Sequence, residues 1–130
     1  LGDVYKRQVG THATCETLER PIKDILRKVA YQPDLFAVGE YNNRLVATVM
    51  IGYDGHRGIL FYFAIDPGYQ GHGIGQKRLN YAERSLTRLG CPKPNILVRS
   101  ENNAGAQFYT KAGFQQDLAA SFGKRLISDH

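Results

Sequence analysis

Apolar residues recur at a helical spacing near the start of the chain. Between Pro21 and Ala30 they fall three or four positions apart, which gives a helix one apolar face: Ile22, Ile25, Leu26 and Val29. Proline suits the first turn of such a helix, so we expect the helix to begin at Pro21. The run Gln32-Pro33-Asp34 then ends it.

Two runs rich in β-branched and aromatic residues follow, and they predict a β-hairpin. Residues 35–41 and 45–53 each have the length of a strand. They are separated by Asn42-Asn43, and asparagine tolerates the positive φ that a tight turn requires. After the short loop 54–58, residues 59–65 are apolar throughout and predict a central strand.

The second half of the chain alternates helical and extended patterns. Residues 74–89 predict an amphipathic helix that Gly90 ends, with one apolar face: Leu79, Ala82, Leu86 and Leu89. The other expected elements are a strand over 95–99, a helix over 104–112 ended by Gly113, and a final strand pair over 114–120 and 122–127. A meander followed by alternating helices and strands predicts the α/β or α+β class, with a mixed, mostly antiparallel sheet flanked by helices.

Composition and charge exclude several classes of protein but do not identify a ligand. The chain has 130 residues and a formal net charge of +5, a sign that suits a phosphate-bearing ligand or a polyanion. It lacks the basic-aromatic pattern of a nucleic-acid-binding domain, and no apolar run is long enough to cross a bilayer. Cys15 and Cys91 stand far apart, which predicts neither a disulfide framework nor a zinc site and favours the reducing cytoplasm.

The first eight residues require a separate interpretation. Residues 3–8, DVYKRQ, read back through the genetic code as GAT GTG TAT AAG AGA CAG, which resembles a transposon end used in preparing sequencing libraries. We therefore expect residues 1–8 to be a translated artefact rather than a natural tail, and one domain over residues 9–130.

Four glycines between the apolar strand and the helix predict an anion-binding turn. Gly68, Gly71, Gly73 and Gly75 lie within eight residues, immediately before the helix. Such a loop directs main-chain N–H groups and the positive end of the helix at one anion, and glycine permits both unusual φ values and a close approach of phosphate. The spacing fits neither the dinucleotide fingerprint nor the P-loop.

Two motifs resemble those of the GCN5-related N-acetyltransferase (GNAT) superfamily. The first is Gln70-x-x-Gly73-x-Gly75, which is similar to the superfamily's pyrophosphate-binding pattern. The second is ENNAGAQFYTKAGF, residues 101–114, in which Asn102 precedes Tyr109 by seven residues and Gly113-Phe114 closes the motif. GYDGHRG, GCPK and GKRLISD also resemble the YpeA-type bacterial branch. The resemblance implies the GNAT fold with its first strand and first helix missing.

The resemblance implies acetyl-CoA as the donor and assigns residues to it. The pyrophosphate would be bound by the main chain of Gln70, Gly71, His72, Gly73, Ile74 and Gly75. The pantetheine arm would pair with the backbone of Phe63, Ala64 and Ile65, and an amide there would face the thioester oxygen. Asn102 would contact the cofactor or serve as an ordinary N-cap, and Tyr109 would protonate the leaving thiolate.

The sequence does not decide which residue is the general base. In the superfamily's ribosomal-protein branch a glutamate lies twelve residues before the tyrosine, and Leu97 occupies that position here. Asp54, His56 or Glu101, acting through water, are the alternatives, and histidine titrates in a useful range. Asp54 and His56 also fit an ordinary solvated turn.

These residues predict an N-acetyltransferase in which a primary amine attacks acetyl-CoA directly within a ternary complex. The acceptor would be a small metabolite or a protein amine, no nucleic acid or membrane is expected as a partner, and the last strands would allow a homodimer. The alternative is a non-catalytic acyl-CoA-binding module.

Overall fold

A computed structural model describes residues 15–128 of the chain, with side chains from residue 23 onward. The chain divides into two compact units, residues 1–97 and residues 98–130. The first unit contains α2 (Cys15–Tyr31), the 3₁₀ turn η1 (Pro33–Leu35), β1 (Phe36–Tyr41), β2 (Arg44–Tyr53), β3 (Gly58–Ile65), the 3₁₀ turn η2 (Pro67–Tyr69), α3 (Ile74–Arg88) and β4 (Pro94–Ile96). The second contains α4 (Asn103–Lys111). The expectations for residues 1–8 lie outside the described residues.

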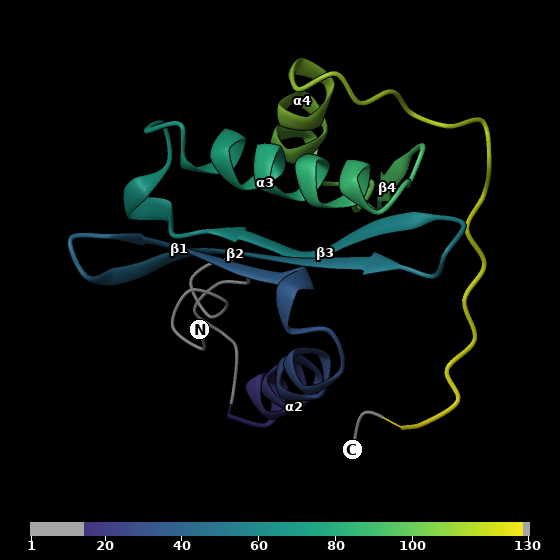
Figure 1. Cartoon of the computed structure of the whole chain (residues 1–130), viewed down its shortest axis with the longest axis horizontal. Coiled ribbons are helices and arrows are strands. Elements are labelled where there is room, and N and C mark those ends of the chain that lie inside the picture. The colour runs from purple at the N-terminus through teal and green to yellow at the C-terminus, as the bar shows by residue number, and fades with distance from the viewer. Residues whose placement is uncertain (1–14, 129–130) are drawn as a thin grey trace. The chain divides into compact units, whose positions relative to one another are not determined.

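The first unit is built around a mixed sheet of four strands. Its order is β1-β2-β3-β4, with antiparallel pairing among the first three strands and parallel pairing between β3 and β4. Helix α3 lies along one face of this sheet and α2 lies on the other (Figure 1). The predicted fold class, a mixed sheet flanked by helices, is therefore confirmed.

The β1–β2 hairpin has the turn that its sequence predicts. Asn42 and Asn43 have φ values of 51° and 62°, which are the left-handed values of a type I′ turn. This turn matches the twist of the two strands, and the register runs from Tyr41 opposite Arg44 to Phe36 opposite Met50. The predicted positions of the turn and both strands are thus correct to within one residue.

Much of the core lies between α3 and the sheet, and Ile25 of α2 and Leu35 of η1 are also buried. Leu79, Ala82 and Leu86 are buried on α3, as the helical spacing predicts, whereas Leu89 is 47% exposed. The largest fully buried strand residues are Val46, Val49 and Ile51 of β2. Because β2 is the central strand of three antiparallel neighbours, its burial fixes the register of the sheet.

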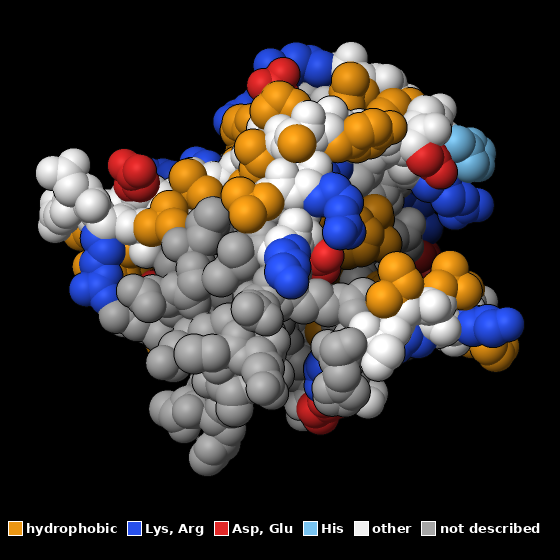
Figure 2. All heavy atoms as spheres, turned by 90° about the horizontal axis from the view of Figure 1, so that it is seen from below, with side chains coloured by type: hydrophobic (Ala, Val, Ile, Leu, Met, Phe, Trp, Pro, Cys, Tyr) orange, Lys and Arg blue, Asp and Glu red, His pale blue; other side chains and the backbone are white. Residues whose placement is uncertain are grey.

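Helix α2 begins earlier than the sequence predicts. It runs from Cys15, so Pro21 lies inside the helix and not in its first turn; the preceding residues 16–20 include good helix formers that extend it. Ile25 is buried, but Leu26 is 64% exposed, so the predicted apolar face is only partly covered. Viewed from the side of α2, the chain exposes apolar side chains among lysines and arginines (Figure 2).

In the second unit the predicted last strand pair is absent. Residues 114–128 form no strand, and Leu118 and Phe122 are almost fully exposed. The large apolar residues Phe114, Leu118, Phe122 and Leu126 lie four positions apart, so polar or small residues occupy the alternate positions of the same strand face. An isolated hairpin with such a face is too weakly stabilised to form.

Candidate functional site

A buried aspartate fixes the loop between β3 and α3. Asp66 is 2% exposed, its Oδ1 accepts a hydrogen bond from the amide of Gly68 at 3.0 Å, and Oδ2 lies 3.9 Å from Nη2 of Arg44. Its own amide donates to the carbonyl of Val46 at 2.7 Å. The loop is thereby attached to the central strand β2 before the glycine-rich stretch begins.

Two glycines have the left-handed conformation that this loop requires. Gly71 has φ +84° and Gly73, the N-cap of α3, has φ +75°. A Cβ at either position would meet nothing within 4 Å, so the backbone conformation and not a lack of space demands glycine there. The predicted glycine turn therefore lies where the sequence places it.

The turn presents a run of main-chain donors. Within the described part of the chain, the N–H groups of residues 71–76 donate to no protein acceptor, and the first bond of the helix is from Lys77 to the carbonyl of Gly73 at 3.1 Å. These groups lie at the positive end of a 15-residue helix. The arrangement can bind an anion such as a diphosphate.

Aromatic side chains support the same loop from the β1–β2 hairpin. The ring of Tyr41 packs edge-on against Tyr69 with 5.5 Å between centroids and lies 6.5 Å from the ring of His72. Nδ1 of His72 is 3.3 Å from the carbonyl of Tyr69. The side chains of Gln70 and His72 are exposed, so both can reach a ligand at the turn.

Arg78 anchors the start of α3 to the edge strand. Its Nη1 donates to the carbonyl of Val38 at 2.9 Å, and its guanidinium lies 5.7 Å from the centroid of the Tyr81 ring. Gly39 lies beside Arg78, and a Cβ there would be in ordinary contact with Arg78 at 3.6 Å but crowded against the Cβ of Ala47 at 3.1 Å. Arg78 therefore holds the helix in place.

Strand β3 contains a bulge at Tyr62 that the sequence analysis did not find. Tyr62 has φ +46°, and the register with β2 shifts between the pairs Thr48–Ala64 and Met50–Phe61. The Thr48 hydroxyl donates to the Tyr62 carbonyl at 2.7 Å. A positive φ at a bulky residue is strained, and such strain gathers at functional sites. The apolar run of β3 gives no signal for it.

The bulge orients the next amide. The C=O and N–H groups of one trans peptide point in opposite directions. Because the Tyr62 carbonyl bonds to Thr48 on β2, the N–H of Phe63 points away from β2. Ala64 is buried and Ile65 is partly buried, opposite Thr48 and Ala47.

Strand β4 pairs with only the first part of β3. Within the described chain, the parallel ladder covers three pairs, from Gly58–Pro94 to Leu60–Ile96. The β2–β3 ladder continues to Ile65. The β3–β4 ladder thus ends before the bulge.

Asp54 and His56 lie at the opposite end of β3 from the glycine turn (Figure 1). Both are exposed, and Oδ1 of Asp54 accepts the amides of Arg57 at 2.7 Å and His56 at 2.8 Å. These bonds hold the pKa of Asp54 below its ordinary value. Since β3 has eight residues, its ends are about 25 Å apart, and the structure does not bring these two side chains to the turn.

Asn102 caps α4 in the second unit. Its Oδ1 accepts a hydrogen bond from the amide of Gly105 at 2.9 Å, and a Cβ on Gly105 would clash with its Nδ2. The N-cap interpretation is therefore confirmed. Among the described residues the Nδ2 group has no protein partner, so it can still donate to a ligand.

Tyr109 lies in α4 with its ring between two phenylalanines. Centroid distances are 5.3 Å to Phe108 and 5.7 Å to Phe114, both edge-on. Burial raises the pKa of Tyr109 to about 12. The phenol is thus protonated throughout the neutral range.

The surroundings of Glu101 do not favour a role as general base. Its side chain is exposed; a hydrogen bond from its own amide, with Ser100 and Arg99 nearby, holds its pKa below the ordinary value.

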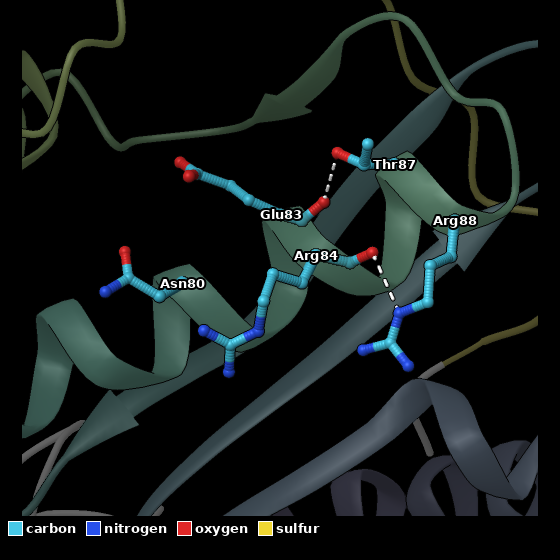
Figure 3. Close-up of a pocket in the computed structure, with 5 residues that line it drawn as sticks. All are labelled: Asn80, Glu83, Arg84, Thr87 and Arg88. Atoms are coloured by element: carbon cyan, nitrogen blue, oxygen red, sulfur yellow. Dashed lines mark hydrogen bonds between the residues drawn. The ribbon is translucent and has the colours of Figure 1, made fainter.

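A hollow of about 660 Å³ lies over the outer side of α3. Its lining residues all come from this one helix: Asn80, Glu83, Arg84, Thr87 and Arg88 (Figure 3). Nε of Arg88 donates to the carbonyl of Arg84 at 3.4 Å, and both side chains are exposed. At 1.5 Å per residue, Arg84 lies about 15 Å along the helix from the glycine turn.

Sequence comparison identifies the family to which these elements belong. The sequence model of the "Acetyltransferase (GNAT) family" matches residues 6–114. The chain belongs to the GNAT acetyltransferase family. It is 43% identical to "Acetyltransferase SG1711" of Sodalis glossinidius over 110 residues, which cover 84% of this chain and 78% of that protein. It is 41% identical over 109 residues to "Acetyltransferase ECA0875" of Pectobacterium atrosepticum, with 84% and 77% covered.

Solved structures share the GNAT fold of this chain. PH1933 from Pyrococcus horikoshii superposes with a TM-score of 0.75 at 22% identity, covering 93% of this chain and 82% of that one. PaiA N-acetyltransferase from Thermoplasma acidophilum, crystallised with coenzyme A, gives 0.73 at 19% identity, covering 92% and 81%. The finer resemblance to the YpeA-type branch stays a prediction.

Two features are absent from the part of the chain that the structure describes. Over that part, no helix is long and apolar enough to span a membrane. No three His, Cys, Asp or Glu side chains gather there as ligands for a metal ion.

Proposed function

We propose that this GNAT protein transfers an acetyl group from acetyl-CoA to a primary amine by direct attack within a ternary complex, in the cytoplasm. The observation that carries the proposal is the run of N–H groups at residues 71–76, which Gly71 and Gly73 direct outward at the start of α3. Coenzyme A bears a diphosphate, and the related T. acidophilum acetyltransferase was crystallised with it. Residues 70–75 would bind this diphosphate.

The bulge supplies the second part of the mechanism. The pantetheine arm would lie along Phe63, Ala64 and Ile65, beyond the end of the β3–β4 ladder. The Phe63 amide, directed away from β2, would donate to the thioester oxygen as negative charge develops there.

We assign the leaving group to Tyr109 and a cofactor contact to Asn102. Tyr109 would donate its hydroxyl proton to the sulfur as the C–S bond breaks, and Asn102 would donate its Nδ2 to the cofactor. A phenol with a pKa near 12 is a weaker acid than a thiol near ~8.5, so complete proton transfer is uphill by about 5 kcal/mol. Tyr109 therefore acts first as a hydrogen-bond donor to the thiolate. We do not place Asp54 or His56 at the reacting atoms, because their hairpin lies at the other end of β3.

A second candidate is an acyl-CoA-binding module without turnover. The surroundings of the three base candidates favour it, because Asp54 and His56 lie at the far end of β3 and Glu101 is exposed.

Thiol release from acetyl-CoA over a panel of primary amines separates the two. A transferase shows amine-dependent release that falls by about 10²–10³-fold in Tyr109→Phe, while calorimetry finds unchanged coenzyme A binding. A binding module shows the binding alone, with no release for any amine. Unchanged binding in Gly73→Trp would refute the assignment of the turn.

A further inference from the structure

The strained residue of the bulge contacts a carboxylate on α2. The hydroxyl of Tyr62 donates to Oδ2 of Asp24 at 3.1 Å, joining helix and strand across 38 residues of sequence. The Asp24 side chain is one-third exposed, so the carboxylate is both held and accessible to solvent.

Asp24 retains capacity to bind a cation. A carboxylate offers about four acceptor positions, and Tyr62 occupies one of them. Nη1 of Arg27 lies 3.7 Å from Oδ1, but the Arg27 side chain is 79% exposed, and such surface pairs are weak. A ligand ammonium can therefore displace this arginine at little cost.

Two other carboxylates of the first unit have structural tasks elsewhere. Asp66 is buried and caps the loop after β3, and Asp54 caps the hairpin at the far end of the strand. Asp24 instead bonds to the bulge itself, one tyrosine side chain from the peptide that orients the Phe63 amide.

We propose that Asp24, held by Tyr62, binds the acceptor amine in its ammonium form beside the thioester carbonyl. The ammonium would lose one proton to water before the free amine attacks, and the nitrogen would lose a second proton to water as the C–N bond forms and the C–S bond breaks. The inference rests on the proposed function, since it uses the bulge as the position of that carbonyl. The carboxylate would form charge-assisted hydrogen bonds with an alkylammonium group, and it would select cationic amines over neutral ones. The acceptor class is thus an alkylamine that is protonated at neutral pH.

Asp24→Asn separates this role from a structural one. The asparagine amide oxygen still accepts the Tyr62 hydroxyl, so the fold is kept while the charge is lost. With n-butylamine as the acceptor we expect the KM to rise by about tenfold and kcat to change less. Trifluoroethylamine, which is neutral near pH 7, should keep its KM. Asp34→Asn, an exposed aspartate on η1, makes the same charge change away from the bulge and should leave both values unchanged.

A second measurement does not depend on turnover. In the full-length chain, the ¹³C resonance of the Asp24 carboxylate should shift saturably on titration with butylammonium chloride and not with 1-butanol. Failure of every amine to release thiol would count against the proposed function, whereas the titration would still decide the ammonium site. No shift, or an equal KM in wild type and Asp24→Asn, would overturn the inference.

Discussion

The ring of Phe114 packs edge-on against the ring of Tyr109, 5.7 Å between centroids, and its amide donates to the Tyr109 carbonyl at 2.9 Å. A second bond, from Gly113 to the carbonyl of Thr110 at 3.1 Å, completes a Schellman cap. Gly113 makes the cap possible with φ +99°. The Gly-Phe pair that closes the motif therefore ends α4 and packs the tyrosine at the same time.

Gly113→Ala should lower the free energy of unfolding by about 1–2 kcal/mol, because an L-residue is strained at this φ. Nothing lies within 4 Å of a Cβ there, so the cost is conformational and not steric. Gly123→Ala is the matched control: its Cβ also meets nothing, its φ is not left-handed, and its stability should not fall. Urea denaturation measures both, and equal losses would contradict the cap.

Gly73→Ala should weaken acetyl-CoA binding by about tenfold or more, because strain at φ +75° turns the N–H groups of the turn away from the anion. Gly55→Ala carries similar strain, at φ +92°, in the distant β2–β3 hairpin. Both variants should lose similar stability, but only Gly73→Ala should lose affinity in calorimetry. Equal affinity losses would refute a local role for the turn.

Tyr109 should make stability fall at high pH. Its pKa rises from 10.0 to about 12 on folding, so below pH 10 both states hold the proton and the pKa shift has no effect on stability. Between pH 10 and 12 the unfolded chain loses the proton first, and stability falls by at most about 3 kcal/mol. The difference in unfolding free energy between wild type and Tyr109→Phe should therefore change across this window. Parallel curves would show that the hydroxyl is not buried in the native protein.

Thr48→Val should loosen the bulge. It removes a 2.7 Å hydrogen bond from a residue that is 5% exposed, so the unfolding free energy should fall by about 1–3 kcal/mol. If the Phe63 amide stabilises the transition state, kcat falls with it. Thr87→Val removes a bond of equal length on the exposed surface of α3 and should cost about 0.5 kcal/mol or less, with kcat unchanged. A normal kcat in Thr48→Val would separate the bulge from catalysis.

The parts of the fold set by local chemistry were predictable from sequence. The Asn42-Asn43 turn and the glycine turn before α3 depend on φ preferences of single residues, and the buried face of α3 follows from helical spacing. The bulge at Tyr62 depends instead on a hydroxyl from another strand and a carboxylate from a helix. No pattern within residues 59–65 marks it, so the Asp24 contact was equally out of reach.

For the segment after Gly113, the sequence predicted strands that the structure does not contain. Its apolar residues suggested strands, but a strand needs a neighbour as well as a composition. Sequence periodicity describes what a segment can bury and not whether a surface is present to receive it.

The attachment of the glycine turn to the sheet has a consequence for ligand affinity. Asp66 bonds to Val46 on one side of the turn, and Arg78 bonds to Val38 on the other. The donors are therefore ordered before any ligand arrives, and little chain entropy is left to lose on association. We therefore expect calorimetry of diphosphate binding to show a favourable enthalpy and only a small loss of conformational entropy.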